Sequence, residues 1–449
     1  MNVDNQNTNL KTLLAVVAIT IGYILNPLNG SLAVTAYPQL SDVFDVPYAH
    51  MSAMVMYFMA ATAVIQPLAG GLGDFLGRKN IFLLGVVGFT VVSAMASVAH
   101  SYQVLIFWRV LQAVFSGVIM ANGMALVAQV APAEKIGSYM GFLHSVFVGS
   151  TVLGFTAGGF LLHFFDWPIL FQVNVPLGIV AFILAFFFIP NDKSSEVRFT
   201  ALSFMGLPVL PLALGLQAMV QQEPLLPYVI TFVVLLAAVM FSIARSQSSR
   251  QQLKTMANQQ FNMGCIVLFA TIAMHFAVVF TLPAWSFAAL GIESGMMGMY
   301  FSLIAGSQVI SGPLFGKFID RYGDKQLRLY AVVAISLSFT LMVFYLNRIS
   351  LAVALAILGT GFAAAQLIAQ KASLLASAED SRALAMGVFS SYRSVGGLSG
   401  NALAALILGS YVTITAGAGV QVLEWAYGLF ILPMGLAMLA LRKNLEARG

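Results

Sequence analysis

The sequence predicts an all-α polytopic membrane protein with 14 transmembrane helices, arranged as two six-helix halves with two extra helices between them. Hydrophobic residues make up 60% of the 449 positions and charged residues only 8%, whereas charged residues make up about a quarter of a typical soluble domain. Uncharged apolar stretches of about 20 residues, the length that crosses a bilayer as a helix, recur along the chain. A repeated loop pattern divides these stretches into two halves.

Fourteen apolar segments are expected to span the membrane. They cover residues 12–37, 48–72, 80–99, 103–129, 137–163, 168–190, 201–220, 226–244, 261–284, 294–315, 328–347, 350–370, 383–409 and 422–441. The first segment is too long for the apolar region of a signal peptide and has no clear cleavage site, so we expect it to remain as the first span. The segments 201–220 and 226–244 decide between twelve and fourteen spans. Both are uncharged, and neither shows the polar face of an amphipathic loop helix.

The positions of the basic residues predict the orientation in the membrane. With the N-terminus in the cytoplasm, all but three of the 21 lysines and arginines lie in inner loops or termini. Arg348 lies in an outer loop, and Arg109 and Arg393 lie inside spans. The positive-inside rule therefore predicts a multi-pass protein of the plasma or inner membrane with both termini in the cytoplasm. The formal net charge of +5 is explained by this topology and does not call for a nucleic-acid partner.

The chain contains an internal repeat. The stretch GGLGDFLGRKN at 70–80 follows the second span, and FGKFIDRYGDKQ at 315–326 follows the tenth. The matched positions, each pair 246 residues apart, are Gly70 and Gly316, Asp74 and Asp320, Gly77 and Gly323, Gly141 and Gly387, and Gly154 and Gly400. Parallel repeats of this kind are typical of transporters. We expect an N-terminal half over 1–190, two additional spans with linkers over 191–260, and a C-terminal half over 261–449.

Several motifs resemble one family. The G-x-x-x-D-x-x-G-R-K pattern of Gly70–Lys79 resembles the signature loop of the major facilitator superfamily, and fourteen spans resemble its drug:proton antiporter branch. Further resemblances lie in span four (Arg109-Val-Leu-Gln112), span five (Gly154-Phe-Thr-Ala-Gly158-Gly159), span six (Asp166–Gly178) and span thirteen (Arg393–Gly400). The motif of span five carries Phe155 where that branch has proline. The resemblance implies multidrug-type efflux of lipophilic compounds by antiport with protons.

The signature loop and its repeat supply candidate gating residues. Their glycines permit a tight turn and close helix approach. Asp74 can pair with arginine or accept hydrogen bonds from a helix N-terminus, and so hold the halves together when the cytoplasmic side is closed. Phe75 stands where the resembled family usually has a basic residue, which the second copy keeps as Arg321. The candidate gating set is Gly70, Asp74, Gly77, Arg78, Lys79, Gly316, Asp320, Arg321 and Gly323. Plain solvated loop charges are the alternative.

Ionisable residues inside spans are functional candidates. Arg109 and Arg393 keep their protons under ordinary conditions, so each needs hydrogen-bond acceptors, an acid or a water-filled cavity. His144 and His275 are the remaining titratable groups in the spans, and either can carry a proton or serve as a hydrogen-bonded structural residue. The candidate motif residues of spans four and five are Arg109, Gln112, Gly154, Gly158 and Gly159, with helix packing as the alternative.

No acid is found within a predicted membrane core, because all 16 acidic residues fall in loops or at span ends. The resembled branch has a proton-linked aspartate in span one, and Asn29 stands at that position here. The surrounding stretch LNPLNGSLAVTAYP contains Pro27 and Gly30, which are expected to loosen the first helix. Asn26 and Asn29 would offer neutral hydrogen bonds to a substrate. The predicted substrate or proton site therefore contains Asn26, Asn29, His144, His275 and Arg393.

The function that fits best is a secondary active transporter that exports lipophilic or amphiphilic small molecules by alternating access. A site with two arginines and no acid should disfavour dications and suit neutral or anionic amphiphiles. Coupling to the proton gradient stays open, as do an uncoupled transporter of a specific amphiphile or metabolite and a non-transporting receptor or scaffold. An enzyme is not expected, since the spans show no nucleophile–base set, metal cluster or phosphate loop. We expect a monomer in the lipid bilayer without cofactor or metal, and the single Cys265 excludes an internal disulfide.

Overall fold

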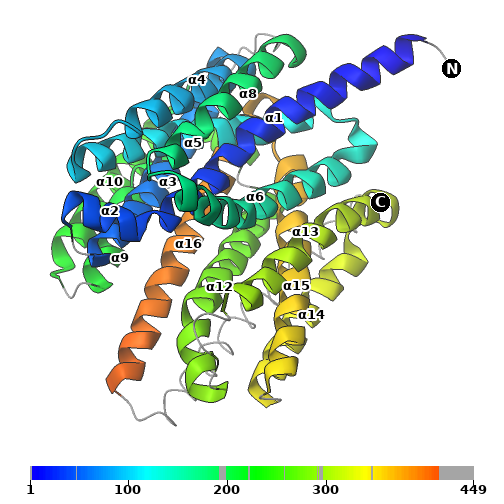
Figure 1. Cartoon of the computed structure of the whole chain (residues 1–449). Coiled ribbons are helices and arrows are strands. Elements are labelled where there is room, and N and C mark those ends of the chain that lie inside the picture. The colour runs from blue at the N-terminus through cyan, green and yellow to red at the C-terminus, as the bar shows by residue number, and fades with distance from the viewer. Residues whose placement is uncertain are drawn as a thin grey trace.

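The described part of the chain is almost entirely helical (Figure 1). The structure is a computed structural model, and it describes residues 3–46, 48–191, 199–220, 223–256, 258–290, 292, 297–344 and 347–413. The α-helices are α1 (Val3–Thr35), α2 (Tyr37–Phe44), α3 (Tyr48–Leu76), α4 (Arg78–Ala96), α5 (Tyr102–Val130), α6 (Ile136–Phe164), α7 (Ile169–Gln172), α8 (Asn174–Phe188), α9 (Val209–Val220), α10 (Leu226–Arg245), α11 (Gln247–Met256), α12 (Gln259–Leu290), α13 (Met297–Tyr322), α14 (Lys325–Phe344), α15 (Arg348–Ala376) and α16 (Arg382–Thr413). The 3-10 turns are η1 (Ala133–Lys135), η2 (Ala201–Gly206) and η4 (Glu379–Ser381).

The all-helical membrane fold predicted from the sequence is confirmed, whereas the count of fourteen spans stays a prediction. Among the described residues, nine helices are long and apolar enough to cross a membrane. The predicted span 422–441 lies outside the described residues. The predicted span 201–220 is divided into η2 and the 12-residue α9. Pro208 lies at this break, where proline has no N–H to continue the helical hydrogen bonds.

The first helix continues through the stretch expected to loosen it. Pro27 lies inside α1, which is helical from Val3 to Thr35. Proline cannot donate to the carbonyl four residues earlier, so the carbonyl of Tyr23 has no helical donor from this position. The hydroxyl of Ser31 donates to the carbonyl of Pro27 at 2.9 Å. The local loss is therefore one backbone hydrogen bond within an otherwise continuous helix.

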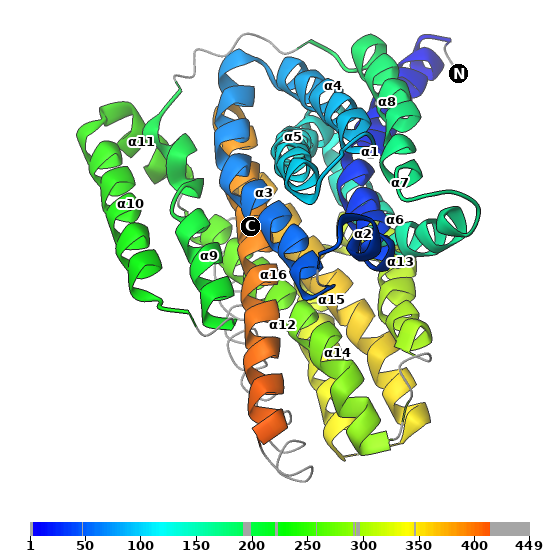
Figure 2. The same cartoon turned by 60° about the vertical axis from the view of Figure 1, so that its left-hand side comes forward.

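Two pairs of helices join the N-terminal and C-terminal halves: α3 packs along α16, and α6 packs along α13. The first pair runs side by side down the middle of Figure 2. Glycines bring each pair into backbone contact. A methyl group on Gly70 would overlap the carbonyl oxygen of Ala383, and one on Gly316 would overlap the carbonyl oxygen of Gly137. Small residues at these positions are therefore a steric requirement of the contact between the halves.

The repeat seen in the sequence extends to these contacts. Residue 137, against Gly316, and residue 383, against Gly70, are themselves 246 positions apart. Gly77 and Gly323, a matched pair of the repeat, both adopt positive φ angles, of 97° and 79°. Such angles suit glycine, because a side chain at these positions is strained. The two halves thus use the same turn at the end of α3 and the end of α13.

The helices between the halves lie at one edge of the molecule (Figure 2). Helix α9 packs against both α3 and α16, while α10 packs mainly against α9 and η2. Gly206 of η2 lies directly on the backbone of α3 at the carbonyl of Val64. The ring of Phe75 lies 6.3 Å from that of Phe199, the residue two positions before η2. Phe75, which stands where the resembled family has a basic residue, thus contacts the segment between the two halves (191–260) through an aromatic pair.

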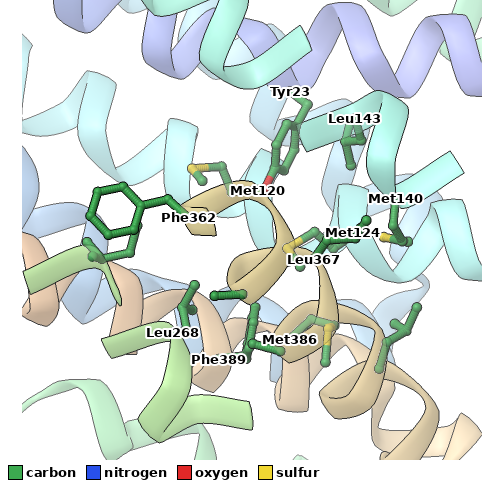
Figure 3. Packing of buried hydrophobic residues seen from close by; sticks show 14 of the residues in the cluster. Tyr23, Met120, Met124, Met140, Leu143, Leu268, Phe362, Leu367, Met386 and Phe389 are labelled. Carbon is green, nitrogen blue, oxygen red and sulfur yellow. The ribbon is translucent and has the colours of Figure 1, made fainter. Parts of the chain in front are cut away.

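The core between the halves contains many methionines and phenylalanines (Figure 3). Met120 and Met124 come from α5 and Met140 from α6, and these residues lie in one buried cluster with Phe362 of α15 and Phe389 of α16. Methionine is flexible and polarisable, so it fills irregular space between packed helices. The described core therefore extends across both halves.

The glycine contact between α3 and α16 predicts a strong effect of a single methyl group. Gly70→Ala should lower the free energy of unfolding by about 1–3 kcal/mol, the usual cost of overpacking a tight contact. Thermal unfolding of the purified protein in detergent measures this change. Gly306→Ala is the matched control, since a methyl there would meet no heavy atom within 4 Å. Equal melting temperatures for the two variants would contradict the requirement for glycine at position 70.

Candidate functional site

Asp74, in the last turn of α3, connects the N-terminal half to the start of α16. Its carboxylate accepts hydrogen bonds from the backbone N–H groups of Ala383, at 3.1 Å, and Leu384, at 2.8 Å. Arg78 donates to the same carboxylate at 3.0 Å and also to the backbone carbonyl of Glu379. The first N–H groups of a helix have no partners within the helix and carry a partial positive charge, so a buried carboxylate is stabilised there.

Asp320, in the last turn of α13, makes the equivalent connection in the opposite direction. It accepts hydrogen bonds from the backbone N–H groups of Gly137, at 2.8 Å, and Ser138, at 2.7 Å, at the start of α6. The hydroxyl of Ser138 donates at 2.7 Å, and Lys371 of α15 pairs with the carboxylate at 2.9 Å. Partial burial raises the pKa of Asp320, but its bonds with Lys371 and Ser138 outweigh this effect and hold the pKa below the ordinary 3.8. We call the Asp74 and Asp320 connections the two latches.

Three other signature-loop candidates also contact the opposite half. Gly70 and Gly316 lie against its backbone, and Arg78 donates to the carbonyl of Glu379. The ammonium of Lys79 lies 5.8 Å from the ring of Phe186, and the guanidinium of Arg321 lies 5.2 Å from the ring of Tyr322. Lys371, which pairs with Asp320, was not among the sequence candidates. It lies on a helix distant in sequence from Asp320, and no local pattern indicated their contact. The gating role of these residues stays a prediction.

A network of amides surrounds Arg109 inside the N-terminal half. Arg109 Nη1 donates to Gln112 Oε1 at 2.7 Å, and Asn29 Nδ2 donates to the same oxygen at 2.9 Å. Gln112 Nε2 donates to Ser93 Oγ at 2.7 Å, and Asn174 Nδ2 donates to Asn29 Oδ1 at 3.1 Å. These side chains come from α1, α4, α5 and α8, so the network joins four helices. Of its members, Ser93 and Asn174 were not sequence candidates.

Arg109 carries a positive charge in this network without a carboxylate partner among the described residues. It is only 2% exposed, and its Nε has no hydrogen-bond partner. Its guanidinium lies 4.6 Å from the ring of Phe58 and 5.8 Å from that of Phe171. Hydrogen bonds and aromatic faces thus take the place of an acid around this charge.

The two candidate asparagines of α1, Asn26 and Asn29, both form hydrogen bonds within the N-terminal half. Asn29 is 1% exposed and bonded to Gln112 and Asn174. Asn26 donates to the hydroxyl of Ser116 on α5. In this structure Asn29 joins helices through hydrogen bonds, and its contact with a substrate stays a prediction.

Arg393, on α16, lies among side chains of both halves. Its Nη1 donates to Gln366 Oε1 at 3.4 Å, and its guanidinium lies 5.4 Å from the ring of Phe147 on α6. The ring of Tyr23, on α1, lies 5.6 Å from that of Phe147, and Tyr23 is close enough to Arg393 to interact electrostatically. Neither aromatic residue nor Gln366 was a sequence candidate.

Of the two candidate histidines, His144 lies near this arginine and His275 lies near His144. His144 is 3% exposed and interacts electrostatically with both Arg393 and His275. The structure gives His144 Nε2 and His275 Nδ1 no hydrogen-bond partner. The ring of His275 lies 5.3 Å from that of Phe362. The structure therefore brings together three of the five predicted substrate or proton residues, from α6, α12 and α16, and leaves Asn26 and Asn29 in the network of the N-terminal half.

The glycines of span five have different surroundings. Gly154 lies against Leu28 and Ser31 of α1, and Gly158 lies against Thr35 of the same helix. Gly159 is exposed, and a methyl there would meet no heavy atom within 4 Å. Close packing of α6 on α1 accounts for the first two glycines. The described residues contain no group of three or more His, Cys, Asp or Glu side chains able to hold a metal ion.

Comparison with known proteins gives one family over nearly the whole chain. Residues 19–264 and 264–448 each match the model of the Major Facilitator Superfamily. The chain is 26% identical over 412 residues to the uncharacterized MFS-type transporter YwoD of Bacillus subtilis, covering 88% of this chain and 90% of the relative. It is 26% identical to the riboflavin transporter RibZ of Clostridioides difficile, covering 70% and 69%. It is 24% identical to the putative multidrug resistance protein MdtD of Escherichia coli, covering 71% and 69%.

Solved structures show the same fold at low sequence identity. The human organic anion transporter MFSD10 superposes with a TM-score of 0.68 at 17% identity, covering 95% of this chain and 99% of that one. The proton:xylose symporter XylE superposes with a TM-score of 0.63 at 14% identity, covering 97% and 96%. At sequence identities this low, the similarity shows a shared fold and does not indicate a shared substrate.

The network around Arg109 predicts different effects for two substitutions of one residue. Gln112→Leu removes the oxygen that accepts from Arg109 and should lower the free energy of unfolding by about 1.5–3 kcal/mol, the usual value for a hydrogen bond to a charged group. Gln112→Glu supplies a carboxylate to the same guanidinium and should retain the stability of the unmodified protein. Thermal unfolding in one detergent compares the three proteins. Equal losses in both variants would show that Arg109 does not depend on this oxygen.

The lowered pKa of Asp320 predicts a pH-dependent contribution of its latch. A carboxylate whose pKa is lower in the folded than in the unfolded protein stabilises the fold at pH values above the unfolded-state pKa, about 3.8. This stabilisation is lost as the pH falls from there through the folded-state pKa. Asp320→Asn should therefore lower the melting temperature at pH 7, and the difference from the unmodified protein should shrink on acidification below pH 4.

Asp324→Asn is the control for this experiment, because Asp324 pairs with Arg328 four residues along the chain, at a partly exposed site. It should have the smaller effect at neutral pH. A constant difference between Asp320→Asn and the unmodified protein across the acidic range would exclude an ionised latch.

Proposed function

The chain belongs to the Major Facilitator Superfamily, and on that basis we propose that it is a secondary active transporter exporting lipophilic or amphiphilic small molecules, neutral or anionic, by alternating access. Its location in this proposal is the plasma or inner membrane, with both termini in the cytoplasm. Export is taken from the resemblance to the drug:proton antiporter branch, and it agrees with the description of MdtD as a multidrug resistance protein.

The observation that carries the proposal is the pair of latches. Each joins the end of a helix in one half to the start of a helix in the other, and both follow the same repeat. Asp74 and Asp320 hold α3 to α16 and α13 to α6, which brings together the ends that the charge distribution predicts to be cytoplasmic. Alternating access requires contacts that close one side and can be broken as a unit, and this arrangement supplies them.

The charge of the interior supports the substrate class. Arg109 and Arg393 lie in the helical bundle, and neither has a carboxylate partner among the described residues. A dication would meet two fixed positive charges with no anion to offset them, whereas a neutral or anionic compound would not be repelled. The aromatic rings beside both arginines offer apolar contact area.

Proton coupling in this proposal is assigned to the histidines. His144, which lies near Arg393, and His275, which lies near His144, each have an unpartnered ring nitrogen. Imidazole is the side chain whose unperturbed pKa lies near neutral pH. The position of the branch's span-one acid is occupied by Asn29, which cannot exchange a proton near neutral pH. A latch carboxylate as the proton carrier and an uncoupled carrier are the alternatives.

The proposal predicts a charge-dependent substrate spectrum. In proteoliposomes with a pH-sensitive dye trapped inside, we expect uptake or counterflow of neutral and monoanionic amphiphiles, and little or none of matched divalent cations. Dye response with substrate present distinguishes a proton-coupled from an uncoupled carrier. Liposomes without protein give the background of passive permeation.

Two results would overturn this reading. Transport of dications at the rate of neutral compounds would remove the charge argument. Counterflow of none of the compounds, with protein shown to be folded by its thermal transition, would favour a receptor or scaffold on the transporter fold.

A further inference from the structure

Arg393 lies deep in α16 and has little to balance its charge. It is eleven residues after Arg382, where α16 begins, which places it about 16 Å along the helix at about 1.5 Å per residue. The described contacts of its guanidinium are one hydrogen bond to Gln366, long at 3.4 Å, and the face of Phe147 at 5.4 Å. A guanidinium has five N–H donors in a planar fork, so most of its donor capacity is unused by these contacts.

The surroundings of Arg393 differ from those of Arg109. Gln112 accepts from Arg109 at 2.7 Å and is itself held by Asn29 and Ser93, so that arginine belongs to a closed network within one half. Arg393 instead lies between the halves, with Phe147 and Tyr23 from the N-terminal half on one side and Gln366 from the C-terminal half on the other. A charge in a site of this kind is costly unless an anion pairs with it.

A second observation points to a ligand at the same place. His144 is only 3% exposed, and its Nε2 has no hydrogen-bond partner. The residue lies close enough to Arg393 to interact with it electrostatically. His275, which interacts with His144, also has an unpartnered nitrogen, Nδ1. A neutral imidazole can donate from one nitrogen and accept at the other, so these groups can hydrogen-bond a carboxyl group in place of water.

The shape of the donors and the aromatic rings beside them select the class of ligand. The guanidinium fork matches the two oxygens of a carboxylate, with parallel hydrogen bonds. The tilted pair of Tyr23 and Phe147, with ring centroids 5.6 Å apart, offers apolar faces next to that fork. A small inorganic anion would satisfy the charge but would make no use of the aromatic rings beside it.

We propose that Arg393 anchors a binding site for amphiphilic monocarboxylates, in which the guanidinium holds the carboxylate and Phe147 and Tyr23 hold the apolar body. This site deepens the proposed transport function and rests on it, since the ligand would be a transported substrate. Gln366 then acts as a positioning residue that orients the guanidinium while the site is empty.

Binding to the full-length protein in lipid nanodiscs tests the site. The probes are radiolabelled naphthaleneacetate and naphthaleneacetamide, which share an aromatic body and differ in charge. The unmodified protein should bind the acid about tenfold or more tightly than the amide. Arg393→Gln should weaken binding of the acid by about tenfold or more, the effect of losing a charged hydrogen-bond pair, and should leave amide binding within about twofold. Arg250→Gln, at an exposed position of α11, is the matched control and should change neither.

A conservative variant distinguishes loss of the binding site from misfolding. Arg393→Lys keeps the positive charge and loses the fork, so it should bind the acid with an affinity between those of the unmodified protein and Arg393→Gln. Unchanged acid binding in both variants, each with a normal thermal transition, would overturn the proposal. Loss of acid and amide binding together in both variants would also overturn it, because a structural role affects the two probes alike.

Two further results separate this proposal from its alternatives. Replacing gluconate with chloride at equal ionic strength should reduce acid binding by less than about twofold; strong displacement by chloride would identify an inorganic-anion site and overturn the carboxylate assignment. Transport of neutral amphiphiles in vesicles, together with acid binding that does not depend on Arg393, would contradict the proposed site but not the proposed transport function. Absence of any transport, with charge-selective binding intact, would contradict the transport function but not the site.

Discussion

The arrangement of the described helices depends on a carboxylate of one half accepting the free N–H groups at the start of a helix in the other half. Asp74 and Asp320 can do this only if the paired helices approach to backbone contact, which is why Gly70 and Gly316 lie beside them. An orphaned donor at a helix start and a carboxylate with limited access to water stabilise each other strongly. The glycine spacing, the tight turns and the burial of the acids follow from this single contact.

The repeat in the sequence predicted much of this contact, because an offset of 246 relates the acids, the turns and the helix starts they meet. What the sequence could not predict was the partner that depends on three-dimensional packing. Lys371 pairs with Asp320 across two helices of one half, whereas Asp74 pairs with Arg78 in its own loop. The repeat thus fixed the position of each acid but not the origin of its counter-charge. The seventh span was predicted from apolar length alone, and the break at Pro208 shows that length does not ensure a continuous helix.

Inside the latches, some contacts across the halves use methionine sulfur as the acceptor, beside a shorter bond from the hydroxyl of Ser391 to the carbonyl of Ala63 at 2.7 Å. Gln370 donates to the sulfur of Met140 at 3.2 Å, and Ser390 donates to that of Met124 at 3.6 Å. A thioether is a weak acceptor, so these bonds satisfy buried polar groups at little cost when they break. The described interface thus has charged hydrogen bonds at one end and weak bonds to sulfur in its interior, a division that would suit the proposed alternating access. Apolar composition predicted neither the donors nor their pairing with sulfur.

The two arginines inside the bundle show why a residue type alone does not indicate a role. Both are charges inside the bundle with no carboxylate partner among the described residues, and sequence reasoning placed them together as features of one cavity. The structure gives Arg109 an amide network that joins four helices, while Arg393 keeps a long bond to Gln366 and aromatic neighbours from the opposite half. A charge whose hydrogen bonds lie within one half would move with that half as a rigid unit. A charge between the halves would change its surroundings if they moved, so the proposed ligand would be bound with different strength in each state, and that difference would couple binding to the proposed alternating access.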